Sequence, residues 1–189
     1  AQGSKSSVQW RFWRSHDRIE RENPVAQSGD LWVRDDRTLF HTRLYHADRR
    51  GIEYRSEDLQ ILNAAPDWAA LATLLDPRLV AALRERESGW RDGYPYRRYT
   101  GASREVAWDI TVRTDWMLPT RIERRGADRQ VETVELLRSF EFGRSPWQPP
   151  ASADYEILDY ADLGDHERDP FVMRVQAEEG GGHLHGHAH

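Results

Sequence analysis

Four histidines near the end of the chain carry the clearest chemical signal in this sequence. They alternate with other residues, at His183, His185, His187 and His189. Side chains two residues apart in an extended chain point to the same face, so several of these imidazoles can reach one ion. Neutral imidazole is the commonest protein ligand for zinc, copper(II) and nickel. The spacing therefore predicts a metal-binding tail.

The donors available in the chain narrow the choice of metal. The sequence contains no cysteine, which leaves imidazole, carboxylate and backbone groups as ligands. Such donors suit a copper(II) or zinc ion rather than copper(I). An acidic, glycine-rich run precedes the histidines, and we expect a flexible tail over residues 178–189. Two other interpretations stay open. In the first, the tail is a purification tag, although a tag is normally an unbroken histidine run. In the second, the tail is a metal buffer without a delivery role.

A second group of potential metal ligands lies just upstream. Five acidic residues and one histidine fall within residues 159–169. Among them, Asp165, His166 and Glu167 are expected to offer donors to a divalent ion, directly or as a second shell for the tail's ion. The segment lacks the spacing of a calcium-binding loop. The alternative interpretation is a loop whose aspartates cap turns and pair with Arg168.

Two further histidines lie within or directly after a predicted strand. His41 and His46 are five residues apart, so they face opposite sides of a continuous strand and cannot share a metal without a bulge. We interpret each as an ordinary strand residue, with the alternative that one of them joins a distant site, for example with His16. The sequence shows no serine-nucleophile elbow, phosphate-binding loop, His-Glu-x-x-His helix or dinucleotide fingerprint. It therefore predicts that the protein is not an enzyme.

Composition limits the class of protein. The chain has 189 residues, which suits one domain with a sizeable core. Its 27 basic and 32 acidic residues are interleaved, whereas a nucleic-acid-binding protein gathers its basic residues on one face. No run approaches the ~20 apolar residues of a membrane span. The small residues at 1–4 fit the mature end left by a removed signal peptide, so we expect export to the periplasm.

Apolar periodicity changes along the chain and predicts an α+β fold that is mainly antiparallel β. Alternation with period two marks short strands before and after a central segment. Within that segment, about residues 56–88, the spacing predicts short helices capped by Ser56, Asp67 and Asp76. After residue 142, the sequence predicts a loop that contains one more strand. The predicted strands are 8–14, 31–33, 39–45, 52–54, 106–113, 121–124 after a break at Leu118-Pro119, 131–142 and 155–158.

The order of these elements resembles one known family. A strand meander, short helices and then long strands, including the run DITVRTDWMLPTRIERR, are similar to the LolA-like periplasmic carriers of lipoproteins. The similarity covers roughly residues 8–142 and lies in the order of the elements. It implies a curved half-barrel sheet with short helices covering its concave face, in a single domain over residues 1–177.

The resemblance also implies an apolar ligand, because carriers of this kind hold an acyl chain between the sheet and the helices. The residues expected to line that space here are Trp10, Phe12, Trp32, Trp108, Ile110, Leu71 and Leu74. Two functions follow. One is a periplasmic accessory protein that captures copper(II) or zinc with its tail and delivers the ion to a client metalloprotein. The other is a carrier of an acyl chain or a lipoprotein.

Overall fold

The computed structural model describes residues 7–36, 38–127, 130–141, 143–144, 146 and 151–182, with only the backbone for 179–182. The chain divides into two compact units. Unit 1 comprises Ala1–Ala65 and Gln148–His189, and unit 2 comprises Pro66–Trp147. Each unit has its own sheet and its own hydrophobic core.

Strands dominate both units, so the predicted mainly antiparallel β fold with a few short helices is confirmed. The helices are α1 (Ser56–Ile61), α2 (Trp68–Thr73), α3 (Pro77–Ala82) and α4 (Pro170–Gly182), with the 3-10 helix η1 (Tyr160–His166). The strands are β1 (Arg11–Arg14), β2 (Arg18–Asn23), β3 (Ser28–Asp35), β4 (Thr38–Tyr45), β5 (Arg50–Tyr54), β6 (Arg84–Arg91), β7 (Tyr94–Ser103), β8 (Val106–Arg113), β9 (Leu118–Arg125), β10 (Val131–Glu135) and β11 (Glu156–Asp159).

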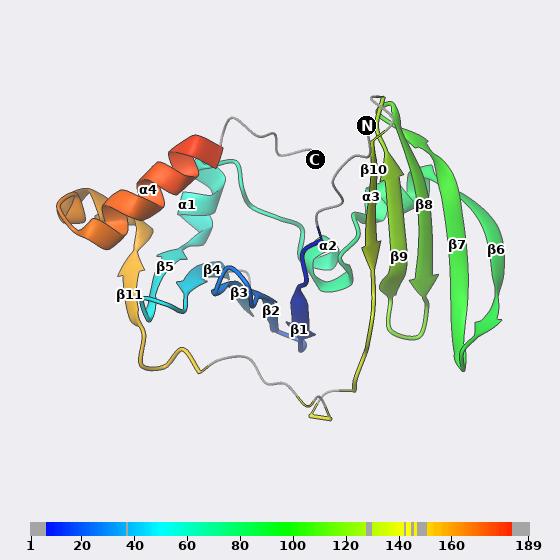
Figure 1. Ribbon diagram of the computed structural model, residues 1–189, viewed down its shortest axis with the longest axis horizontal. Helices are drawn as coiled ribbons and strands as arrows, with labels where there is room; N and C mark the ends of the chain where they lie inside the picture. Colours follow the sequence, from blue (N-terminus) through cyan, green and yellow to red (C-terminus); the bar gives the residue numbers. More distant parts are fainter. Residues whose placement is uncertain are drawn as a thin grey trace. The chain divides into compact units, whose positions relative to one another are not determined.

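The sheet of unit 1 brings the two ends of the sequence together. Over the described residues its strand order is β1-β2-β3-β4-β5-β11 (Figure 1). The first five strands form an antiparallel meander, and β11 adds to β5 in parallel, with Glu156 opposite Arg50. The backbone N–H of Glu156 also donates to the Arg49 carbonyl, at 3.1 Å. The start of β11 therefore lies on the turn between β4 and β5, residues 46–49.

Helices cover one part of this sheet. Figure 1 shows α1 and α4 beside β5 and β11, and the hydrophobic core lies between these elements. Phe171, Val172 and Val175 of α4 are 5%, 0% and 0% exposed, so one face of α4 is a core element. The other buried members of this core are Tyr45, Ile52, Tyr54, Leu59, Leu158 and Leu163.

Helix α4 corrects the prediction that most of the chain after residue 142 is loop. Asp169 accepts a hydrogen bond from the Phe171 N–H at 2.8 Å, and Pro170 is the first helical residue. An aspartate cap followed by proline is a helix start signal. The apolar residues 171, 172 and 175 follow it at helical spacing. The helix continues over 178–182, residues that were predicted to belong to the flexible tail.

Unit 2 is an antiparallel meander with helices on one side. Its strands follow the order β10-β9-β8-β7-β6 over the described residues. Asp67 caps α2 and Asp76 caps α3, as predicted, by accepting from the N–H groups of Ala69 and Arg78 at 2.8 and 2.7 Å. The end of α3 lies directly on the sheet, because a Cβ built at Gly101 would be 3.0 Å from Leu83. The buried core consists of Leu75, Leu83, Ile110 and Val112.

Four local predictions are wrong. Ser56 does not cap α1. Its hydroxyl instead exchanges hydrogen bonds with the backbone of Leu39 on β4, at 2.9 and 3.0 Å. Residues 84–88 belong to strand β6, which pairs with β7, and the strand expected over 131–142 ends at Glu135. The expected break at Leu118-Pro119 lies inside β9, where a register shift opposite Pro119 accommodates the missing N–H.

Arginine and acidic residues pair across the strands of unit 2, as expected for a solvated face. Arg98 of β7 holds Asp109 of β8 with two hydrogen bonds, at 2.9 and 2.5 Å. Arg121 of β9 lies 3.3 Å from Glu135 of β10. None of the helices in the described part of the chain is long and apolar enough to cross a membrane.

The packing of α4 predicts which of its residues carry stability. Val172→Ala removes two buried methyl groups and should lower the free energy of unfolding by about 2 kcal/mol. Met173→Ala is the matched control, because Met173 is 56% exposed on the same helix and should change stability by less than about 0.5 kcal/mol. Chemical denaturation of both variants measures the difference. Equal stabilities of the two variants would contradict the packing of α4.

Candidate functional site

The predicted metal-binding tail directly follows Gly182, the last described residue. His183, His185, His187 and His189 lie outside the described residues, so their role stays a prediction. The last described element, α4, ends at Gly182, immediately before the first of these histidines. The position of α4 therefore fixes the point from which the tail leaves unit 1.

The start of α4 is held by arginine–carboxylate pairs. Arg50 of β5 donates to Asp169 at 2.8 Å and pairs with Glu156 of β11 at 3.0 Å. The hydrogen bond from Arg50 and the N–H of Phe171 lower the pKa of Asp169, so this carboxylate stays ionised and keeps capping the helix. One turn further along α4, Arg174 pairs with Asp48 of the β4–β5 turn at 2.6 Å.

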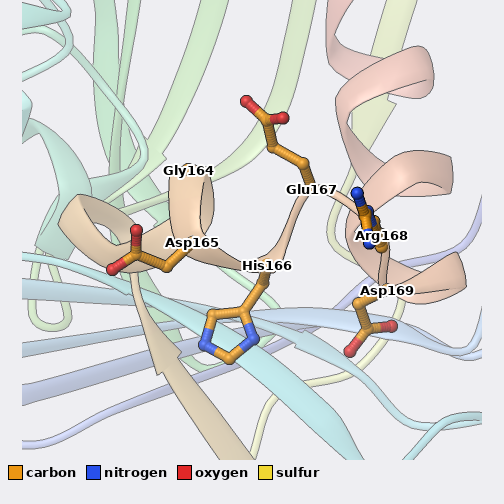
Figure 2. Close-up of a pocket in the computed structure, with 6 residues that line it drawn as sticks. All are labelled: Gly164, Asp165, His166, Glu167, Arg168 and Asp169. Atoms are coloured by element: carbon orange, nitrogen blue, oxygen red, sulfur yellow. The ribbon is translucent and has the colours of Figure 1, made fainter.

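The second predicted ligand group lines a hollow of about 450 Å³ between η1 and α4 (Figure 2). Its lining residues are Gly164, Asp165, His166, Glu167, Arg168 and Asp169. Figure 2 shows the side chains of Asp165, His166 and Glu167 pointing in different directions. Asp169 is occupied by Arg50 and the helix cap. The structure thus places the predicted residues in one short segment without gathering their donor atoms.

No three histidine, aspartate or glutamate side chains converge on a possible ion position in the described ranges.

The fold also sets a distance between the hollow and the tail. Helix α4 has 13 residues, and at 1.5 Å per residue it is about 20 Å long. Seven fully extended residues span at most about 25 Å. Of the tail histidines, only those nearest the end could therefore reach back to His166.

His41 is hydrogen-bonded to a carboxylate and lies between two aromatic rings. Its Nε2 lies 3.0 Å from Asp30 on β3, and its ring stacks on Trp32 at 3.8 Å and on Tyr54 at 5.4 Å. Arg21 of β2 pairs with the other oxygen of Asp30 at 2.9 Å. Burial opposes ionisation of Asp30, but the hydrogen bond from His41 and the charge of Arg21 outweigh it and lower the pKa of Asp30 to about 2.

His46 belongs to a separate buried cluster. Its Nε2 lies 2.5 Å from Glu22 of β2, and its Nδ1 lies 3.0 Å from the hydroxyl of Tyr155, directly before β11. Glu22 is 3% exposed, and its Oε1 has no hydrogen-bond partner among the described residues. The carboxylate occupies the space beside Gly29, where a Cβ would be 2.3 Å from it. Burial raises the pKa of Glu22, and the hydrogen bond with His46 opposes that rise.

The interpretation of His41 and His46 as ordinary strand residues missed both pairings. Asp30 comes from β3, the strand next to β4, Glu22 comes from β2, one strand further away, and Tyr155 is 109 residues away from His46. β4 ends at Tyr45, so His46 lies in the turn after it, and the expectation made for a continuous strand does not apply. The partners of the two histidines lie on opposite faces of the sheet. Asp30 lies opposite Arg21 and Arg43 in the sheet, whereas Glu22 lies opposite Gly29, the residue next to Asp30.

The residues expected to line an apolar ligand site belong to two different units. Trp32 stacks on His41 in unit 1, where Trp10 is 52% exposed and Phe12 is half-buried. In unit 2, Trp108 and Ile110 pack with α3 residues in the core. Leu71 is half-buried, and Leu74, at the end of α2, is 39% exposed. Within each unit, these side chains contribute to packing or to the surface.

No protein-family model matches the sequence, and no curated protein matches it significantly. Any function of this chain is therefore inferred from its own residues.

The ion pairs of Asp30 predict a specific acid sensitivity. Because the pKa of folded Asp30 is about 2, below its ordinary 3.8, its stabilisation is complete above about pH 4 and is lost as the pH falls through 2. By linkage, the loss is about 2 kcal/mol between pH 5 and pH 2. Asp30→Asn should remove this part of the acid destabilisation. Asp154→Asn should not, since the Asp154 side chain is 82% exposed. Denaturant unfolding of the three proteins at both pH values measures it, and identical pH dependence in wild type and Asp30→Asn would contradict it.

Proposed function

We propose that this chain is an exported accessory protein that captures copper(II) or zinc with its histidine tail and passes the ion to a client metalloprotein. The observation that supports this function is the alternation of four histidines directly after a helix that ends at Gly182. Imidazole donors with no thiolate in the chain suit copper(II) and zinc.

The folded part of unit 1 supports a tail that binds metal by itself. Both ring nitrogens of His46 are engaged, by Glu22 and Tyr155. The Nε2 of His41 is held by Asp30, and its ring is stacked between Trp32 and Tyr54. His166 lies at the far end of α4 from the tail. The tail histidines are therefore the best remaining ligands in the chain.

Delivery to a client fits a tail made of many equivalent donors. An ion held by several imidazoles can be transferred one ligand at a time, without passing through a free ion. Each imidazole must be neutral to bind, so capture should weaken as the pH falls through about 6.5, the ordinary pKa of histidine. In this scheme α4 fixes the tail to the folded domain, which is free to dock on the client.

The resemblance to LolA-like carriers supports a second hypothesis, in which an acyl chain binds between the sheet and the helices. A strand meander, three short helices over residues 56–82 and a second meander follow one another as that resemblance implies. The curved half-barrel and the apolar ligand stay predictions. Saturable binding of a fluorescent fatty acid would support this carrier function, and failure to bind it would contradict it.

The metal-capture proposal predicts that the tail carries the affinity. A chain ending at Gly182, and a full-length variant with the four tail histidines changed to asparagine, should both bind copper(II) and zinc at least about tenfold more weakly than wild type. Isothermal titration of tag-free protein, with circular dichroism to confirm folding, measures the effect. Equal affinity and stoichiometry in full-length and shortened protein would contradict the role of the tail.

His166→Gln is the matched control for that experiment. It removes one imidazole from unit 1 and leaves the tail intact. Because α4 separates His166 from the tail by about 20 Å, affinity should stay within about twofold of wild type. A loss as large as that of the shortened chain would show that the hollow of residues 164–169 completes the site.

A further inference from the structure

Three side chains from distant parts of unit 1 form one hydrogen-bonded chain at the start of β11. Glu22 comes from β2, His46 from the turn after β4, and Tyr155 from the residue before β11. Both ring nitrogens of His46 are engaged, one by each partner. The imidazole therefore links the meander of the first 54 residues to the C-terminal segment.

The number of protons shared by Glu22 and His46 determines whether the charges in this cluster are balanced. With one proton shared between Glu22 and His46, the buried pair is neutral overall, or an ion pair, and the remaining hydrogen bond joins His46 to Tyr155. A second proton leaves a neutral acid beside an imidazolium whose side chain is only 15% exposed. A buried charge without a counter-charge is strongly destabilising.

The charged groups around the cluster do not supply that counter-charge. Glu20, on the same strand as Glu22, is 2.6 Å from Arg18. Asp30 is held by Arg21 and His41. Arg49, whose guanidinium lies 5.8 Å from the Tyr155 ring, is paired with Asp154 at 3.6 Å, so these two groups together add no net counter-charge. Burial also raises the pKa of Glu22, so its carboxyl group takes up a proton more readily than an exposed one.

We propose that Glu22, His46 and Tyr155 form an acid-sensitive latch that holds the start of β11 on the β4–β5 turn. At neutral pH the latch is closed. Acid adds a second proton to the Glu22–His46 pair, and the uncompensated charge draws His46 toward water and away from Tyr155, which loosens the first residues of β11. The N–H of Glu156, which donates to the Arg49 carbonyl at 3.1 Å, is the nearest backbone reporter of that event.

The same sheet contains a built-in control. His41 pairs with Asp30 and stacks between Trp32 and Tyr54, so it has a carboxylate partner but belongs to a different cluster. The pKa of Asp30 is lowered to about 2, so the carboxylate stays available to neutralise a protonated His41 in mild acid. His41→Gln should therefore leave the pH response of β11 unchanged.

Hydrogen exchange of the full-length protein, in the presence of a chelator, tests the latch. The protection factor of the Glu156 amide, corrected for intrinsic exchange, should fall by about tenfold or more between pH 7.5 and pH 5. In His46→Gln it should fall by less than about twofold, because an amide does not titrate. Tyr155→Phe keeps the ring and removes the hydroxyl, so protection should be low at both pH values.

Several results would overturn the proposal. They are unchanged protection of Glu156 in wild type at pH 5, an unchanged pH response in Tyr155→Phe, or loss of the response in His41→Gln. Amides of Val172 in unit 1 and Ile110 in unit 2 report global unfolding, since both side chains are 0% exposed. A parallel fall of all three amides would mean that acid unfolds the protein rather than opening a latch. If His46→Gln does not fold, the Tyr155→Phe comparison decides the question.

Discussion

Arg50 makes the contacts on which the arrangement of unit 1 depends. Its guanidinium reaches Asp169, which caps α4, and Glu156, which begins β11, and it lies 4.4 Å from the ring of Phe171. The side chains of Arg50 and Asp169 are 15% and 24% exposed, so this pair is shielded from water more than a surface ion pair is, whereas Glu156 is 63% exposed. One residue of β5 thus fixes the start of both C-terminal elements, and the burial of Phe171, Val172 and Val175 supplies the apolar free energy that keeps them in place.

The rigid attachment of α4 constrains the proposed metal capture. A helix of about 20 Å lies between the hollow of residues 164–169 and the first tail histidine. A seven-residue tail therefore cannot gather all four imidazoles at that hollow. If the captured ion needs further ligands for selectivity, a client or a second molecule is better placed to provide them than Asp165, His166 or Glu167.

Local signals predicted much of the fold, and long-range pairing explains what they missed. The caps at Asp67 and Asp76 were predictable because the aspartate and the N–H that it binds are two residues apart. Helix α4 carried the same signal at Asp169-Pro170, but its polar and glycine-rich second half resembled a flexible tail. The Glu22–His46–Tyr155 cluster had no comparable signal, because its members are 24 and 109 residues apart and meet only through strand register. A glutamate in an arginine-rich strand is predicted to face solvent, and only the assembled sheet shows that Glu22 is buried.

The two histidine–carboxylate pairs of unit 1 show why residue type alone does not determine electrostatic behaviour. Asp30 has an arginine as well as a histidine, and together they outweigh its burial and keep it ionised. Glu22 has only His46, with one oxygen lacking a partner among the described residues, and burial prevails. The difference arises from neighbours: Arg21 lies across the strand from Asp30, whereas Gly29 lies across from Glu22 and contributes space rather than charge. Placing a side chain at Gly29 would therefore do more than cause a clash. It would expel the Glu22 carboxylate from its site and leave His46 without its acid partner.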